Sequence, residues 1–589
     1  MRVSVPGVGE SSETIHFTYE GQTVSGHVGD SVAASLIDVG LLECRATGDG
    51  SKRGVFCGMG SCNECAIVVD GTPGLLACMI YAEDGMIIER QEAYPAPPVL
   101  PAQEPERRDL APSVLVIGGG PAGMSVAATV AESGVDVVLV DERARLGGQY
   151  YKQPAQNRAI DSNRLDHQYR AGRELIARVD AAGVDVIAGA SIWGAFSPNL
   201  LMAAGNGISW TLRPHRLVVA TGAQERAVPI PGWTLPGVMM TGAAQTLLRS
   251  NQVAPGRRVL ISGNGPLNMQ LAAELLKAGV EIAALVEQAD LRWWTNWLPG
   301  AGMAVSAPEI VRRGMSYRTA LARERVPVLD RSSAVEIHGK DRVEAVTVAS
   351  VRRSGTRVAG TEKEFEVDAV CLGYGFIPSN EIPRSLGCAH HLEPSGTLAT
   401  TKSITGRTSL ESVWVVGDAG GVQGANVAQA RGEIAAFEIL EGLGVSSSGP
   451  ALSSLKRAQR SLNRHRRFQK SLAALYDARS LTTELAQPDT TICRCESVSL
   501  RQLTQSFADG AMSAGASKRV TRAGMGKCQG RYCSQSIISL AAAAGGSEIE
   551  EFSGFAPQAP MRPTEIGLVA DSMVATNATR TKANQEPKT

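Results

Sequence analysis

No stretch of this sequence is long and apolar enough for a membrane-spanning helix. None approaches the length of about 18 residues that such a helix needs, so we expect no transmembrane segment. Residues 1–6 also lack the apolar core of a signal peptide. We therefore expect a cytoplasmic protein, with a peripheral position at the inner membrane, reached through a complex, as the alternative.

An excess of charge of either sign is also absent. The 58 lysines and arginines balance 58 aspartates and glutamates, so the formal net charge is zero. This balance argues against nucleic acid as a partner of the whole chain. The eight histidines are scattered, and the sequence shows no acid–base or nucleophile constellation. We therefore nominate no catalytic residue.

Cysteine is scarce outside two short groups. Eight of the eleven cysteines are grouped, as Cys57, Cys62, Cys65 and Cys78 and then as Cys493, Cys495, Cys528 and Cys533. The other three, Cys44, Cys371 and Cys388, are expected to be buried or inert thiols. Without a secretion signal, such grouping indicates metal binding rather than disulfides.

The first cysteine group follows a predicted hairpin and helix. Residues 14–20 and 22–28 flank a Gly21 turn, and Asp30 is a candidate N-cap for a helix over 31–40. The spacing C-x4-C-x2-C-x12-C begins as the plant-type [2Fe–2S] pattern, and its glycines let backbone N–H groups turn toward sulfur. We predict a β-grasp [2Fe–2S] ferredoxin domain over 1–92, with a zinc site as the alternative. Residues 93–112 hold six prolines and predict a semi-extended linker.

The second cysteine group has the spacing C-x-C-x32-C-x4-C. Two close thiolate pairs brought together by short helices can hold one site of tetrahedral sulfur ligands. The pattern resembles the small ferredoxin module first named for its association with bacterioferritin. We predict a small helical [2Fe–2S] domain over 489–566, with zinc as the alternative.

A glycine-rich turn comes directly after the linker. Residues 114–117 predict a buried strand, and the glycines that follow permit a tight turn, a pyrophosphate contact and close helix packing: Gly118, Gly120 and Gly123. The helix N-terminus, predicted to lead into a helix over 125–134, faces the phosphates. A second strand ends at Asp141 and Glu142, where a ribose acceptor is expected. This full context favours a dinucleotide site over a purely structural glycine turn.

The same pattern occurs a second time. Residues 258–268 repeat the strand and the turn, and the next strand ends at Glu287. This duplication predicts an α/β fold with two dinucleotide-binding domains, one formed by 113–250 and 360–445 and the other, inserted in it, by 251–359. A late strand over 413–416 delivers Gly417 and Asp418 at its carboxyl end, where α/β sheets hold ligands.

This core resembles the glutathione-reductase-like flavoproteins. The resemblance implies that the first glycine motif binds FAD, that the Gly-Asp strand contacts the ribityl chain and pyrophosphate, and that the second fold binds NAD(P)H. The FAD-binding residues that we expect are Gly118, Gly120, Pro121, Ala122, Gly123, Asp141, Glu142, Gly148, Gln149, Thr221, Gly222, Gly417 and Asp418.

Two features depart from that family. The second site would comprise Gly263, Gly265, Asn268 and Glu287, but Asn268 replaces the third glycine and its side chain would push the helix from the strand. Binding of NAD or ATP there is therefore an open prediction. No cysteine lies between Cys78 and Cys371, so the redox-active pair of a disulfide reductase is missing and that activity is excluded.

The whole chain resembles the α subunits of bacterial amino- and imino-acid dehydrogenase complexes. The resemblance rests on the order of the domains and on two sequence motifs, GVFCGMGSC over 54–62 and TRAGMGKCQGRYC over 521–533. The family includes the opine, hydroxyproline and proline dehydrogenases, hydrogen cyanide synthase and heterotetrameric sarcosine oxidase. The resemblance implies an electron-transfer component in which FAD is flanked by two [2Fe–2S] clusters. A D-amino-acid-oxidase-like flavoprotein β subunit would oxidise the C–N bond. Other possible partners are a downstream electron acceptor and a further small subunit. The alternatives are a self-sufficient NAD(P)H-dependent reductase and a non-enzymatic scaffold.

Three remaining segments have less specific patterns. Residues 291–300 carry three tryptophans and predict a satellite apolar cluster or a subunit interface. Residues 455–476, within a helical linker over 446–488, predict a basic amphipathic helix that is solvated or bridges the core and the tail. Residues 567–589 predict a tail that is disordered or bound to a partner.

Overall fold

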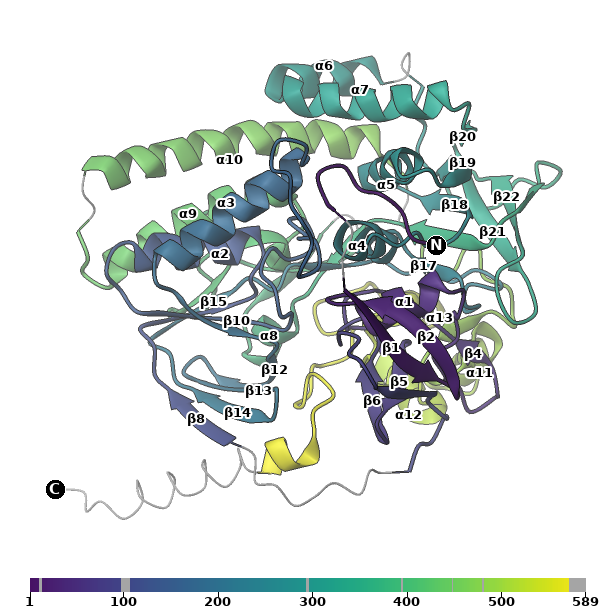
Figure 1. The fold of residues 1–589 in the computed structure, drawn as a ribbon, viewed down its shortest axis with the longest axis horizontal. Helices are drawn as coiled ribbons and strands as arrows, with labels where there is room; N and C mark the ends of the chain where they lie inside the picture. The colour runs from purple at the N-terminus through teal and green to yellow at the C-terminus, as the bar shows by residue number, and fades with distance from the viewer. Residues whose placement is uncertain are drawn as a thin grey trace.

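The computed structural model describes residues 1–9, 13–96, 106–292, 296–393, 396–446, 449–478 and 481–570. Two α/β layers lie beside each other, and the first and last units of the chain lie side by side next to them (Figure 1). A long helix, α10 (Gly449–Leu475), runs across the two layers. Among the described helices, none has the length and apolar character that crossing a membrane requires.

The N-terminal unit is built on one mixed sheet in the order β2-β1-β7-β5-β6. Its strands are β1 (Thr14–Tyr19), β2 (Gln22–His27), β5 (Ala66–Val69), β6 (Thr72–Leu76) and β7 (Ile87–Arg90). The β1–β2 hairpin agrees with the prediction, and β7 pairs parallel to β1. Helix α1 (Val32–Asp38) is capped by Ser31, whose hydroxyl accepts from the Ala34 N–H at 3.2 Å, and not by Asp30 as we expected. Two short strands, β3 (Arg45–Ala46) and β4 (Lys52–Arg53), precede the cysteine loop.

The first dinucleotide layer is a parallel sheet in the order β11-β10-β9-β15-β28. The strands are β9 (Val114–Ile117), β10 (Val137–Asp141), β11 (Asp185–Ala188), β15 (Arg216–Val219) and β28 (Val413–Val415). One face packs against α2 (Pro121–Ala131), α3 (His167–Ala181) and α9 (Ala425–Gly442). The other face packs against a second, mixed sheet of β12 (Ser191–Ser197), β13 (Leu200–Gly205), β14 (Ile208–Leu212) and β8 (Glu106–Leu110). In this sheet β12, β13 and β14 are antiparallel, and β8 pairs parallel to β14. Strand β8 falls in the segment that we predicted to be linker.

The second layer is also parallel, in the order β17-β24-β18-β19-β20. Its strands are β17 (Val238–Met240), β18 (Arg258–Gly263), β19 (Glu281–Glu287), β20 (Val328–Leu329) and β24 (Ala369–Gly373), with α4 (Thr241–Asn251) and α5 (Pro266–Lys277) packed on them. Strands β17 and β24 lie outside residues 251–359, so this sheet extends past both boundaries that we expected. An antiparallel sheet of β21 (Ser332–His338), β22 (Ala345–Ser350) and β23 (Lys363–Glu366) adjoins it, and β16 (Ala223–Glu225) pairs with β25 (Phe376–Pro378) between the layers.

The C-terminal unit is small and helical. It contains β29 (Thr491–Cys493), β30 (Val498–Ser499), α11 (Leu500–Ala508), α12 (Ala514–Thr521) and α13 (Ser534–Gly545), and a core that includes Leu503, Phe507 and Ile537. Ser499 and Gln502 form a capping box at the start of α11. Beyond it, Leu568 is buried against Trp193 and Met202, so the tail that we expected from residue 567 begins as packed chain; residues 571–589 lie outside the described ranges.

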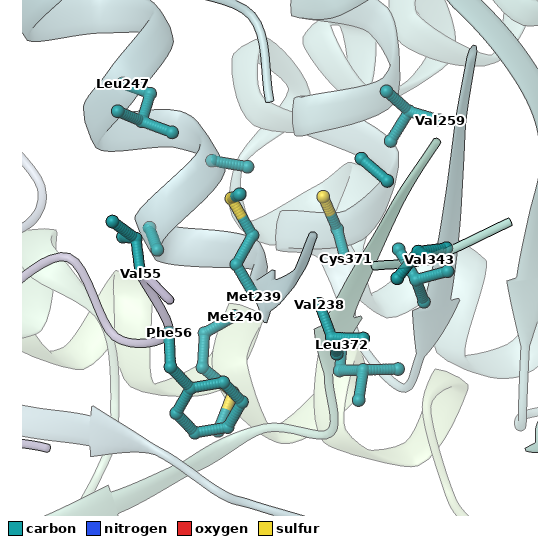
Figure 2. Close-up of a cluster of buried hydrophobic side chains, with 14 of the residues drawn as sticks. Val55, Phe56, Val238, Met239, Met240, Leu247, Val259, Val343, Cys371 and Leu372 are labelled. Carbon is teal, nitrogen blue, oxygen red and sulfur yellow. The ribbon is translucent and has the colours of Figure 1, made fainter. Parts of the chain in front are cut away.

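One large core joins the N-terminal unit to the second layer. Figure 2 shows Val55 and Phe56 from the cysteine loop beside Met240 of β17, with Cys371 of β24 close by. Burial raises the pKa of the Cys371 thiol far above its ordinary value, which fits the inert role that we expected for it. Because these side chains share one core, the N-terminal unit is a fixed part of the molecule rather than a tethered domain.

Helix α6 (Trp297–Ser306) and the start of α7 (Pro308–Arg323) pack on the C-terminal half of α10, and the rest of α7 packs on α5 (Figure 1). Phe468 of α10 packs against Met303 and Ala307, whereas Trp297 is 63% exposed. The satellite apolar cluster is therefore wrong for Trp297; the other two tryptophans of this segment, Trp293 and Trp294, lie outside the described residues. The basic helix forms as predicted, and its Ala458 and Leu462 pack on α9.

Candidate functional site

The first glycine motif has the close packing that a pyrophosphate-binding turn needs. A Cβ atom on Gly123 would lie 1.9 Å from the Gly118 carbonyl oxygen, and one on Gly118 would lie 2.4 Å from the Ala220 carbonyl oxygen. Pro121 occupies the first turn of α2, where its missing N–H costs nothing. Helix α2 therefore begins at Pro121, four residues earlier than we expected, and its free N–H groups face the turn.

The two acids at the end of β10 have different partners. Asp141 is buried, and its carboxylate accepts from the N–H groups of Gly119 at 2.5 Å and Arg143 at 2.7 Å. Burial raises the pKa of Asp141 to about 6. Glu142 instead forms an ion pair of 3.1 Å with Arg562 of the C-terminal unit. Asp141 is thus the acid that faces the glycine turn.

Other residues that we expected to contact FAD gather around the same turn. Gly148 approaches Gly120, and Gly417 approaches Ala122 at the start of α2. Asp418 accepts from the N–H groups of Gln423 and Gly424 at 2.8 and 3.1 Å, just before α9 begins. Thr221 lies at the end of β15, where its hydroxyl donates to the Ser379 carbonyl at 2.6 Å, and Gly222 also bonds to Ser379. The carbonyl of Gln149 accepts from Lys152 at 2.7 Å.

Two lysines that the sequence did not single out lie near these residues, Lys152 buried and Lys402 partly buried. Burial lowers the pKa of Lys152 to about 7 and that of Lys402 to about 7. Lys402 donates to the Gly420 carbonyl, and its charge interacts with Asp418. Lys152 lies four residues after Gly148, and Lys402 lies upstream of the strand that leads to Gly417 and Asp418. Position in the sequence was the only signal for either lysine, and it is too weak to identify them.

The second glycine motif accommodates Asn268 without losing its helix packing. The Asn268 amide donates to the Gly373 carbonyl at 2.9 Å, and its oxygen accepts from the Thr241 hydroxyl at 2.8 Å. Its side chain fits because Gly263 and Gly373 face it. The expected displacement of the helix is therefore wrong, because glycines on the strands supply the room.

Glu287 keeps the geometry of the second motif. Its carboxylate accepts from the N–H groups of Gly265 and Ala289, both at 3.1 Å. Burial raises the pKa of Glu287 to about 8. Both glycine motifs thus end in a buried acid that is bonded to a glycine of the turn.

The four cysteines of the first group meet in one loop region. Cys57, Cys62 and Cys65 are buried and Cys78 is partly buried. The neighbouring thiols of Cys57 and Cys65 raise the pKa of Cys78 well above its ordinary value. Backbone N–H groups of Met59 and Glu64 point at the sulfur atoms of Cys57 and Cys62, at 3.5 and 3.4 Å, which is the loop geometry that an iron–sulfur cluster requires.

The second cysteine group forms two close pairs. The pKa of Cys495 is raised by the Cys528 thiol and that of Cys533 by the Cys493 thiol, so the pairs are Cys495 with Cys528 and Cys493 with Cys533. Within the described ranges, no three His, Cys, Asp or Glu side chains are arranged to hold a single metal ion. Four cysteine thiols that lie this close together are a ligand set that a [2Fe–2S] cluster or tetrahedral zinc could use.

The two cysteine sites lie next to each other. One small cavity is lined by Cys62 of the first site and by all four cysteines of the second. Glu64 and Arg494, which lie inside the two ligand loops, form an ion pair of 2.9 Å between them. Although burial opposes ionisation, Arg494, Arg45 and Arg53 lower the pKa of Glu64 to about 2. In the sequence, each cysteine motif contains one of these two charged residues, but nothing in the sequence indicates that Glu64 and Arg494 pair with each other.

Comparison with known proteins agrees with this architecture. Three family models match: "Pyridine nucleotide-disulphide oxidoreductase" over residues 112–432, "2Fe-2S iron-sulfur cluster binding domain" over 12–93 and "Sarcosine oxidase A3 domain" over 488–572. Together with the fold, they define a flavoprotein oxidoreductase with an FAD-binding domain and an N-terminal [2Fe–2S] domain. The chain belongs to the pyridine nucleotide-disulphide oxidoreductase family.

Curated relatives cover most of the chain. An opine oxidase subunit of Rhizobium meliloti is 28% identical over 80% of this chain and 90% of its own length, and hydrogen cyanide synthase subunit HcnB of Pseudomonas protegens is 32% identical over 71% and 89%. The alpha subunit of a Corynebacterium sarcosine oxidase is 26% identical over 45% of this chain, but only 26% of that protein is matched. Among solved structures, L-proline dehydrogenase from P. horikoshii shares the fold, with a TM-score of 0.68 and 21% identity over 97% of this chain and 100% of that one.

Proposed function

We propose that this chain is the electron-transfer subunit of a cytoplasmic multi-subunit dehydrogenase or oxidase. Its partner, a D-amino-acid-oxidase-like β subunit, would oxidise the C–N bond of an opine, an imino acid or an amino acid. The observation that carries the proposal is the contact between three sites. Arg143, beside Asp141, donates to the Gly58 carbonyl of the first cysteine loop at 2.8 Å, and that loop in turn contacts the second cysteine site.

The chemistry of these groups suits electron transport. FAD accepts two electrons at once and can release them singly, whereas a [2Fe–2S] cluster carries one. The turn at Gly118–Gly123, with Asp141 and Asp418, would hold FAD. Cys57, Cys62, Cys65 and Cys78 would hold the first cluster, and Cys493, Cys495, Cys528 and Cys533 a second one. This chain's own residues therefore bind and orient the carriers, and the substrate would react in the partner.

An exposed apolar surface supports a protein partner. Trp297, Leu298 and Val305 of α6 are 63%, 63% and 86% exposed. Exposed aromatic and aliphatic side chains that cluster on one helix are typical of subunit interfaces. We assign this face of α6 to the contact with another protein of the complex, and the names of the relatives, each a subunit of an oxidase or synthase, favour such a complex.

A self-sufficient NAD(P)H-dependent reductase is the second candidate. It is favoured by the geometry of the second motif, where Glu287 holds the Gly265 N–H and Asn268 fits without displacing α5. A carboxylate at this place would suit the 2′-hydroxyl of NAD better than a 2′-phosphate. NAD or ATP bound there could also serve a structural role in the electron-transfer subunit.

Dye-reduction assays separate these candidates. The chain would be purified alone and together with a co-expressed D-amino-acid-oxidase-like flavoprotein, and reduction of an artificial dye would be followed with NADH, opines, proline and hydroxyproline. We expect activity only with the amino or imino acids and only with the partner present. Activity of the isolated chain with NADH would instead support the reductase. If the complex kept full activity after this chain had lost its flavin and iron, both candidates would be excluded and a non-enzymatic scaffold would remain.

A further inference from the structure

Glu64 and Arg494 connect the ligand loops of the two cysteine sites across 430 positions of sequence. Glu64 lies between Cys62 and Cys65, and Arg494 lies between Cys493 and Cys495. Their side chains are 1% and 4% exposed, and the guanidinium Nε and Nη2 atoms reach Glu64 Oε2 at 3.0 and 2.9 Å. The pair is bidentate on the arginine side and sealed from water, so its charges act through a low effective dielectric.

The cluster of charges around Glu64 carries a surplus of positive charge. Glu64 is also paired with Arg45 at 2.6 Å and with Arg53 at 3.5 Å, so three arginines surround one carboxylate. Arg494 is fixed further by the Phe56 and Trp233 rings, at 3.9 and 4.8 Å from their centroids, and it donates to the Trp233 carbonyl at 2.6 Å. These contacts hold the guanidinium group in one place, at the boundary between the two sites.

A second link runs parallel to the first. The hydroxyl groups of Ser61 and Tyr532, the residues just before Cys62 and Cys533, lie 2.5 Å apart in the protein interior. Tyr532 also packs edge-on against Phe56 at 5.7 Å. Two buried hydrogen-bonded links, each adjacent to a cysteine of both sites, therefore fix the distance and orientation of one site relative to the other.

We propose that Glu64 and Arg494 are positioning residues that set the reduction potentials of both clusters together and make them one electron-transfer unit. Reduction adds a negative charge to a cluster, and nearby buried charges favour or oppose it according to their sign. Because the pair lies between the sites, a change in its charge shifts both potentials in the same direction. The first site then lies between the flavin-binding loop, which it contacts through Arg143, and the second site. This inference rests on the proposed function, since it requires that both sites hold clusters.

Two charge-removing variants of the full chain test the proposal. Arg494→Gln removes a positive charge, so we expect lower midpoint potentials for both clusters in EPR-monitored redox titrations. Glu64→Gln removes the negative charge, so we expect higher potentials for both. Arg501→Gln is the matched control, because Arg501 pairs with Asp489 on the surface of the same C-terminal unit, with the two side chains 63% and 84% exposed; its potentials should equal those of the wild type.

A milder variant keeps the test decisive if either substitution prevents cluster loading. Arg53→Gln leaves Glu64 with its two closer arginines and should lower both potentials less than Arg494→Gln. Iron content and EPR of the wild type come first. A wild type that holds one cluster, or zinc, overturns the proposed second cluster. If the wild type holds both clusters but the variants leave both potentials unchanged, or shift the potential of one cluster only, then Glu64 and Arg494 do not set the two potentials together. That result overturns this inference and leaves the proposed function intact.

Discussion

At the scale of single residues, the tightest constraint is at Gly123. A Cβ atom there would lie 1.9 Å from the Gly118 carbonyl oxygen, a distance that only a shift of the turn could relieve. We predict that Gly123→Ala abolishes FAD binding because the turn and the α2 N-terminus must separate. The measurement is the ratio of flavin to protein absorbance after purification, with and without added FAD.

The matched control is Gly314→Ala in α7, where a Cβ atom meets nothing within 4 Å. This variant should keep its flavin and gain up to about 1 kcal/mol from the better helix propensity of alanine. Normal flavin content in Gly123→Ala would contradict our assignment of the turn to FAD.

A second residue-scale prediction concerns Glu225. This buried carboxylate accepts from the Gly242 N–H at 2.8 Å, and its other oxygen has no hydrogen-bond partner. Burial raises the pKa of Glu225 to about 8 from an ordinary value of 4.5. Its contribution to the free energy of unfolding is therefore complete below pH 4.5 and is lost as the pH rises toward 8.

Glu225→Gln keeps the acceptor and stays neutral at every pH. The stability of this variant relative to the wild type should therefore increase between pH 5 and pH 9. The difference in the free energy of unfolding should change by at most about 4 kcal/mol, and the Tm of the variant should rise relative to that of the wild type. Thermal scans of the flavin-free protein at both pH values measure this difference. A constant difference between the two proteins would mean that Glu225 does not titrate in this window.

The residue scale also separates what could be predicted from what could not. Glycine and cysteine motifs are readable because turn geometry and metal ligation fix residue type at short spacing. Asp30 was misread as an N-cap because its real partners, Arg2 and Arg158, are far away in the sequence, which left Ser31 to cap α1. The Glu64–Arg494 pair escaped prediction for the same reason: the sequence gives charges but no partners.

At the scale of elements, the parallel strands and the helices that follow glycine turns could be predicted. The apolar runs of β9, β10 and β18 are local signals that leave little choice of fold. The start of α2 was placed late because the proline at its first turn was not counted as helical. Strands β17 and β24 were assigned to the wrong layer, since only pairing across more than a hundred residues places β24 beside β18 and β17 beside β24.

Asn268 provides a prediction at this scale, because its amide ties α5 to β24 and α4. Asn268→Ala removes both hydrogen bonds and leaves the Gly373 carbonyl and Thr241 hydroxyl buried without this partner. We expect a loss of about 1–3 kcal/mol, and a somewhat larger loss for Asn268→Gly, which restores the usual motif residue but adds the cost of glycine within a helix.

Thermal unfolding and an NADH-binding titration of both variants measure the two consequences. If Asn268 alone prevented nucleotide binding, Asn268→Gly would acquire NADH affinity; because Asn268 already fits, we expect no change in affinity. Stability equal to that of the wild type would show that the two amide bonds contribute nothing to the packing of α5.

At the scale of the whole molecule, the arrangement of the sites differs from the order of the domains in the sequence. The sequence placed the flavin-binding core between the two cysteine groups, and we expected FAD to be flanked by clusters. The structure instead brings the first and last units into contact, so that the cysteine sites adjoin each other. Chain order could not give this result, because contacts such as Ser61–Tyr532 join residues 471 positions apart.

The N-terminal unit is held to the core by a buried ion cluster, and this yields the last prediction. Asp30 is fully buried and pairs with Arg2 at 2.7 Å and with Arg158, from the flavin-binding layer, at 2.6 Å. Asp30→Asn would leave the buried Arg158 charge without its carboxylate, at a cost of up to about 3–5 kcal/mol. We expect limited trypsin digestion to release a fragment of about the first 92 residues faster than from the wild type.

Asp489→Asn, which breaks an exposed pair with Arg501, should leave the digestion rate unchanged, because a surface pair contributes at most about 1 kcal/mol. Equal rates for Asp30→Asn and the wild type would mean that the apolar core around Phe56 and Met240 is sufficient to hold the unit in place.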